Sequence, residues 1–135
     1  MAYLEGAEIL EMRLLPGIHK ELGFYFGYVK HSGDTSWLTE AAPFFSDLLL
    51  LITTSMILAK AKTSKYYDQI LLFGIISPIV DLVYNYQGGL WRTGTDVADL
   101  LEMLPRIMVH TSFLLVIVAS IIILYYYRNI RRNYT

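Results

Sequence analysis

Six side chains within apolar stretches of this chain are of types that could do chemistry. They are Lys20, Glu21, Asp47, Asp81, Asn85 and His110. A charged group inside a bilayer costs at least ~2.5–3.5 kcal/mol on insertion scales, so such groups are candidates for function. Carboxylates and imidazoles bind protons, metal ions and cationic groups. The six residues are therefore the predicted lining of a binding site, with no catalytic role assigned to any of them.

The third apolar stretch carries a stripe of small and polar residues. They recur at spacings of three and four, on one face of a helix: Gly74, Ser77, Asp81, Asn85 and Gly88. Pro78 lacks a backbone donor and frees a carbonyl nearby, and freed backbone groups can line a cavity beside Asp81. The polar side chains could instead hydrogen-bond to neighbouring helices, at about 0.6 kcal/mol per contact. Both interpretations remain open.

The composition indicates which elements must position these groups. The chain has 135 residues, of which 55% are apolar and 17% charged. Soluble domains have about 45–50% apolar and about 25% charged residues. A chain this small has too little interior to bury the excess, which must face lipid or partner subunits. We therefore predict an all-α, polytopic integral membrane protein.

Other classes of protein are excluded or disfavoured. There is no cysteine, which excludes a disulfide-stapled secreted domain and any thiolate metal site. The net charge of −1 argues against a nucleic-acid partner. The expected partners are the lipid bilayer and a transmembrane peptide or lipid ligand. The sequence leaves the cofactor unknown. It also leaves the oligomeric state open, with a homo-oligomer as one possibility.

Four stretches approach the roughly 20 apolar residues that a transmembrane helix needs. They are residues 7–29, 43–59, 66–87 and 103–127. Together they predict a four-helix transmembrane bundle in a single domain, 1–135. The first stretch contains several charged residues, so its alternative is an amphipathic helix on the membrane surface.

The basic residues predict an orientation, because short loops rich in Lys and Arg face the cytoplasm. The connection between the second and third stretches and the end of the chain hold six of the eleven basic residues: Lys60, Lys62, Lys65, Arg128, Arg131 and Arg132. The other two connections hold Lys30, Arg92 and Arg106. With four spans, both termini are predicted to be cytoplasmic.

The ionisable groups also share a depth. At about 1.5 Å per residue, Glu21 lies roughly 12 Å from the outer end of its stretch, Asp47 roughly 6 Å, Asp81 roughly 9 Å and His110 roughly 8 Å. This predicts a polar pocket in the outer half of the bundle, in which Lys20 could pair with Asp81. Asp47 has another explanation, because a carboxylate in the first turns of a helix interacts favourably with the helix dipole.

The segment Leu15–Gly27 resembles the zinc-binding helix of site-2-protease-type intramembrane metalloproteases, which carries His-Glu-Leu-Gly-His. Residues 21–23 match its middle three positions, whereas Lys20 and Phe24 replace the two histidine ligands. Residues 77–81 are similar to the family's later proline-containing motif, whose aspartate is the third ligand. Phenylalanine and protonated lysine do not bind zinc, so the resemblance implies a proteolytically inactive relative without a metal.

Three functions compete on this sequence. The first is a non-catalytic binding or scaffold protein that uses the outer polar pocket. The second is an oligomeric ion- or proton-coupled transporter or channel that uses Glu21 and Asp81. The third is a membrane metalloenzyme with Glu21, Asp81 and His110 as ligands. The sequence leaves an enzymatic role open and favours the first function.

Overall fold

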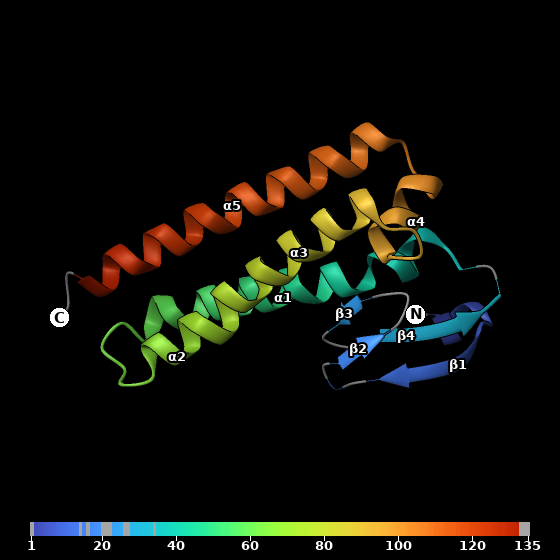
Figure 1. The fold of residues 1–135 in the computed structure, drawn as a ribbon. Helices are drawn as coiled ribbons and strands as arrows, with labels where there is room; N and C mark the ends of the chain where they lie inside the picture. The colour runs from blue at the N-terminus through green and yellow to red at the C-terminus, as the bar shows by residue number, and fades with distance from the viewer. Residues whose placement is uncertain are drawn as a thin grey trace. The chain divides into compact units, whose positions relative to one another are not determined.

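The computed structural model describes residues 2–13, 15, 17–19, 23–25, 28–33 and 35–132 (Figure 1). The chain divides into two compact units, Met1–Thr39 and Glu40–Thr135. The described residues are mostly helical and form four helices. These are α1 (Trp37–Lys60), a continuous helix over Tyr67–Trp91, α4 (Asp96–Met103) and α5 (Arg106–Arg132).

The first unit contains a short 3-10 turn, Ala2–Glu5, and two pairs of antiparallel strands. Strands β1 (Glu8–Arg13) and β4 (Tyr28–Ser32) pair with each other, and β2 (Gly17–His19) pairs with β3 (Gly23–Tyr25). The second pair lies inside the first along the chain, so the strands follow one another as in a single hairpin. Residues 20–22, which follow β2 in the sequence, lie outside the described residues.

The predicted helix over 7–29 is wrong, because the described residues of this stretch form strands. The sequence gives physical reasons for the difference. Pro16 and the glycines at 17, 23 and 27 disfavour a helix interior. Aromatic and β-branched residues are frequent from residue 24 to residue 29, and such side chains favour strands. The four-helix transmembrane bundle is thus reduced to three long helices and the short α4.

The other three predicted spans are confirmed as helices. The continuous helix comprises α2 (Tyr67–Leu71), a π-helical stretch over Leu72–Ile76 and α3 (Ser77–Trp91). It, α1 and α5 are each long and apolar enough to cross a membrane. Helix α1 begins at Trp37, six residues before the predicted start of its span.

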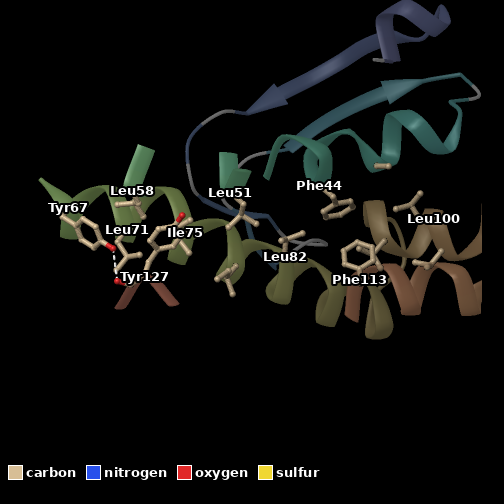
Figure 2. Packing of buried hydrophobic residues seen from close by; sticks show 14 residues of the cluster. Phe44, Leu51, Leu58, Tyr67, Leu71, Ile75, Leu82, Leu100, Phe113 and Tyr127 are labelled. Atoms are coloured by element: carbon tan, nitrogen blue, oxygen red, sulfur yellow. Dashed lines mark hydrogen bonds between the residues drawn. The ribbon is translucent and has the colours of Figure 1, made fainter. Parts of the chain in front are cut away.

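Apolar side chains from α1, α2, α3, α4 and α5 form one core (Figure 2). Those labelled in the figure are Phe44, Leu51, Leu58, Tyr67, Leu71, Ile75, Leu82, Leu100, Phe113 and Tyr127. The rings of Phe44 and Phe113 meet edge to face with centroids 4.8 Å apart, a geometry that aromatic pairs prefer. This contact fixes α1 against α5.

Two glycines let helices approach closely. A Cβ atom at Gly74 would overlap the side chain of Thr54 on α1, and one at Gly89 would overlap Val97 on α4. Small residues at helix contacts allow backbones to come together, which is a common feature of packing in membranes. Gly74 therefore sets the separation between α1 and the π-helical stretch.

The helix that contains Pro78 is continuous, although the sequence predicts that this proline breaks the helical hydrogen bonding and frees a backbone carbonyl. Directly before the proline, the backbone N–H of Ser77 donates to the carbonyl of Leu72, five residues earlier. The π-helical turn holds one residue more than an α-turn, and such stretches are frequent at functional sites. The interruption thus lies immediately before the part of α3 that carries Asp81.

Much of the apolar surface points away from the core. Only 17% of the most apolar stretch of α5 is buried, and 22% of that of α1. Large side chains such as Phe73, Leu115 and Ile122 are more than 60% exposed. A water-soluble monomer rarely exposes contiguous apolar area on this scale, whereas a bilayer would cover it.

Candidate functional site

Two carboxyl groups meet between α1 and α3. Asp47 on α1 and Asp81 on α3 lie within hydrogen-bonding and Coulombic reach of each other. Both residues are partly buried, and the Oδ2 atom of Asp47 is buried without a hydrogen-bond partner. Neighbouring carboxylates repel each other when both are ionised, and an unsatisfied oxygen adds a desolvation cost. The pair is therefore prepared to accept a proton, a donor group or a cation.

Asn85 orients one of these carboxyl groups. Its Nδ2 atom donates to Oδ2 of Asp81 at 2.9 Å and to the backbone carbonyl of Asp81 at 3.1 Å. Both bonds lie within one helix, between residues four apart. Asp81 and Asn85 thus act as a unit on α3. The alternative interpretation of the stripe, in which its polar side chains bond to neighbouring helices, fits Asp81, which lies beside Asp47 on α1.

The aspartates lie deeper along their helices than the sequence predicts. Asp47 follows the start of α1 at Trp37 by ten residues, and Asp81 precedes the end of α3 at Trp91 by ten. Each is therefore about 15 Å from that end, compared with the roughly 6 and 9 Å expected. The explanation of Asp47 by the helix dipole is wrong, because that effect is confined to the first turn.

His110 has a different neighbour. Its Nδ1 atom lies 3.0 Å from the hydroxyl of Tyr86, and the two rings meet nearly edge-on. Tyr86 follows Asn85 directly and stacks on Phe113 with centroids 5.2 Å apart. The sequence analysis missed Tyr86, although its spacing of four from the buried Leu82 would have placed it toward the core.

The remaining predicted site residues, Lys20 and Glu21, lie outside the described residues. Their convergence with Asp81, including a Lys20–Asp81 ion pair, stays a prediction. Neighbouring residues 17–19 and 23–25 form strands, so the described part of the metalloprotease-like segment lacks the helix that would place two ligands four apart on one face. In the part of the chain that the structure describes, no three His, Cys, Asp or Glu side chains are grouped to hold a metal ion.

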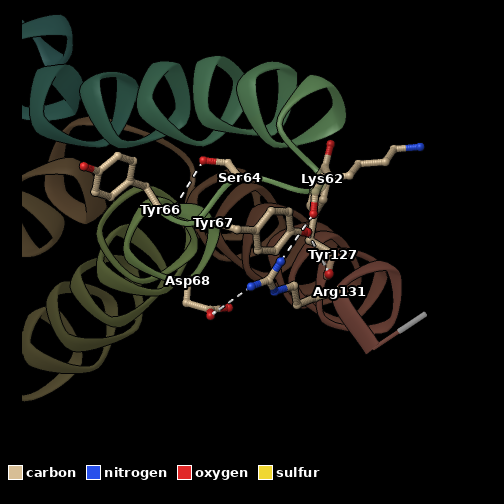
Figure 3. Close-up of polar contacts among 7 residues, drawn as sticks. All are labelled: Lys62, Ser64, Tyr66, Tyr67, Asp68, Tyr127 and Arg131. Atoms are coloured by element: carbon tan, nitrogen blue, oxygen red, sulfur yellow. Dashed lines mark hydrogen bonds and ion pairs between the residues drawn. The ribbon is translucent and has the colours of Figure 1, made fainter. Parts of the chain in front are cut away.

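A second polar cluster, missed by the sequence analysis, lies at the other end of these helices (Figure 3). The hydroxyl of Tyr67 donates to the backbone carbonyl of Tyr127 at 2.8 Å, and the hydroxyl of Tyr127 donates to the backbone carbonyl of Ser55 at 2.6 Å. Nearby, Arg131 lies 3.7 Å from Asp68 and donates to the carbonyl of Lys62 at 3.5 Å. These contacts join α1, α2 and α5.

Comparisons with known proteins add no relative to this picture. Neither the protein-family models, nor the curated proteins, nor the solved structures include a match to this chain.

Proposed function

We propose that this chain is an integral membrane protein in which α1, the helix Tyr67–Trp91 and α5 each cross the bilayer. The exposed apolar surface of the three helices supports this placement. The six basic residues at the α1–α2 connection and at the end of α5 favour a cytoplasmic location for that end. With three spans, the N-terminal end of α1 lies on the non-cytoplasmic side. Of the two predicted cytoplasmic termini, only the C-terminus is kept.

Within this placement, the function that the geometry supports best is that of a non-catalytic binding or scaffold protein. The observation that carries it is the contact between Asp47 and Asp81, about 15 Å from one end of each helix. Ionisable groups at such a depth are expensive to keep and mark binding sites by default. The Oδ2 atom of Asp47 is buried and accepts no hydrogen bond, so its capacity to accept a donor is unused.

The partner that matches this chemistry is a transmembrane segment with a cationic or hydrogen-bond-donating side chain at mid-depth. A Lys or Arg in a lipid-facing position is costly by itself, and a carboxyl pair would relieve that cost. Asn85 keeps the carboxyl of Asp81 in one orientation, which reduces what the site must reorganise on binding.

A defined peptide pair tests this proposal. The full chain is reconstituted in nanodiscs with a polyleucine transmembrane peptide that carries one central Lys, or with the same peptide carrying Leu there. Energy transfer between labels reports association. The Lys peptide is expected to associate more strongly, and the double variant Asp47→Asn/Asp81→Asn should lose the difference. Equal association of both peptides with the wild-type chain would refute the proposal.

A second function is favoured by one further observation, the π-helical stretch next to Pro78. π-helical turns are frequent at functional sites, and ion- and proton-coupled transporters bind their ions near the middle of the membrane. An oligomer of this chain would then move protons or cations past Asp81. Flux into liposomes tests it: wild-type chain and Asp81→Asn should differ, and identical proton and cation fluxes would exclude this function.

The kinship with intramembrane metalloproteases stays a prediction. Histidines at positions 20 and 24 of homologous sequences would support it.

A further inference from the structure

We propose that one end of the helical unit binds the phosphate-bearing headgroups of anionic lipids. This basic end consists of Lys60, Lys62, Lys65, Arg128, Arg131 and Arg132. The inference uses the membrane placement given above but is independent of the carboxyl pair, which lies many residues away on each helix.

The first step is that contacts gather these residues from three parts of the chain. The bond from the Tyr127 hydroxyl to the carbonyl of Ser55 holds the end of α5 against the end of α1. The bond from Arg131 to the carbonyl of Lys62 ties the same part of α5 to the α1–α2 connection (Figure 3). The contacts among α1, the α1–α2 connection and α5 thus hold the basic residues in one region without a ligand.

The second step distinguishes basic side chains that hold the helices together from those that are exposed to a ligand. Arg131 is engaged, because it lies 3.7 Å from Asp68, donates to Lys62 and stands over the ring of Tyr67 at 5.3 Å. Lys60, Arg128 and Arg132 are exposed. Arg131 therefore holds the helices together, and these three side chains can reach a ligand.

The third step is charge. Asp68 is the only acidic residue between positions 60 and 70 or between 103 and 132, so the six basic residues are far from neutralised. The opposite end has the reverse balance: Arg92 and Arg106 accompany Glu40, Asp96, Asp99 and Glu102. Clusters of four to eight Lys and Arg next to a membrane span attract anionic lipids, and Arg and Lys are the usual ligands of phosphate.

Native mass spectrometry of the full chain in detergent tests the proposal. Short-chain phosphatidylglycerol, phosphatidylcholine or inorganic phosphate is added, and bound molecules are counted. Phosphatidylglycerol should bind more tightly than phosphatidylcholine. The variant Lys60→Gln/Arg128→Gln/Arg132→Gln should weaken it about a hundredfold, at about fivefold per charge. The matched control, Arg92→Gln/Arg106→Gln, removes charge from the other end and should bind phosphatidylglycerol like the wild type.

Several outcomes would overturn the proposal. They are equal binding of the two lipids, unchanged binding by the triple variant, or an equal loss in the control. Tight binding of inorganic phosphate that displaces the lipid would mean a free-anion site instead. If the triple variant does not fold, salt provides the test on the wild-type chain. Binding of phosphatidylglycerol should weaken between about 0.05 and 0.5 M NaCl, and indifference to salt contradicts the inference.

Discussion

At the scale of single residues, Asp47 is the least well satisfied side chain among those described. Its Oδ2 atom is buried without a hydrogen-bond partner, and the neighbouring group is another carboxyl. Natural proteins tolerate such an arrangement mainly where activity needs it, at the expense of stability. The residue therefore gives a test in which stability and function should move in opposite directions.

Replacement of Asp47 by Asn should stabilise the chain by about 0.5–2 kcal/mol, because the neutral amide removes a like-charge contact and can donate to Asp81. Thermal unfolding in detergent, followed by circular dichroism, measures this. The same variant should lose the preference for the Lys peptide. Asp68→Asn is the control: its carboxylate is exposed and lies 3.7 Å from Arg131, and such an ion pair contributes about 1 kcal/mol or less. A large destabilisation of Asp47→Asn would contradict our interpretation of the pair.

Glu5 provides a residue-scale test outside the proposed spans. Its carboxylate accepts bonds from the hydroxyl and the N–H of Ser36 and from the hydroxyl of Thr39, at the start of α1. The bonds from Ser36 hold the pKa of Glu5 below its ordinary value of 4.5. Because the pKa is lowered in the folded chain, the contact is fully present above the ordinary value and is lost as pH falls through the lowered pKa.

The amide signal of Ser36 in NMR spectra of the micelle-bound chain should therefore titrate with a midpoint below pH 4.5. Glu5→Gln should abolish the titration, whereas Glu8→Gln, which changes an exposed carboxyl on β1, should leave it intact. A midpoint at or above the ordinary glutamate value would show that the Glu5–Ser36 contact does not form.

At this scale the sequence predicted part of the site. Asp81 and Asn85 could be paired from their spacing alone, because residues four apart lie on one face of a helix. That Asp47 meets Asp81 depends on how α1 packs against α3, and local spacing does not contain that information. The link from Glu5 to Ser36 crosses 31 positions and was equally out of reach.

At the scale of elements, the packing of α1 against the π-helical stretch depends on Gly74. Any larger residue must displace Thr54, which is buried. The same contact keeps the part of α1 that carries Asp47 close to α3. Gly74 is thus expected to matter both for stability and for the carboxyl pair.

Gly74→Ala should destabilise the chain by about 1–3 kcal/mol, the usual cost of overpacking. Gly88→Ala is the matched control on the same continuous helix, since a Cβ there meets nothing within 4 Å. It should be neutral or stabilise by up to about 1 kcal/mol, because alanine is the better helix former. Chemical unfolding in mixed micelles measures both, and equal effects of the two substitutions would disprove the role of the close contact.

The elements themselves were predicted unevenly. The three long spans follow from runs of apolar residues, and the structure has helices there. The stretch 7–29 has the apolar content of a span, but its glycines and Pro16 disfavour the predicted helix. The π-helical stretch carries no distinct sequence signal beyond Pro78, since it depends on how one extra residue is accommodated between packed helices.

At the scale of the whole molecule, the number of spans decides which segments share a side of the membrane. In the proposed arrangement one span, the helix Tyr67–Trp91, separates the α1–α2 connection from the α3–α4 connection. The chain has no cysteine, so single cysteines report their location without background. Thr63 and Thr93 are exposed and lie in these two connections.

In intact cells that express the chain, Thr93→Cys should react with a membrane-impermeant maleimide, and Thr63→Cys should react only after permeabilisation. This pattern follows from the cytoplasmic placement of the basic end. The unmodified chain is the control and should not be labelled. Reaction of both cysteines from the same side would rule out a spanning helix between them, and the opposite pattern would invert the proposed orientation.

The π-helical stretch also bears on which changes of length the chain can tolerate. Removal of one residue from Leu72–Ile76 would restore a regular α-turn and leave the helix after it nearly in phase, because the π-helical turn already accommodates one extra residue. Asp81 and Asn85 would then still face α1. The same deletion just after Pro78, in regular α-helix, would instead rotate both residues by about 100° and should abolish the carboxyl pair, although the shortened helix would still be long enough to cross a bilayer.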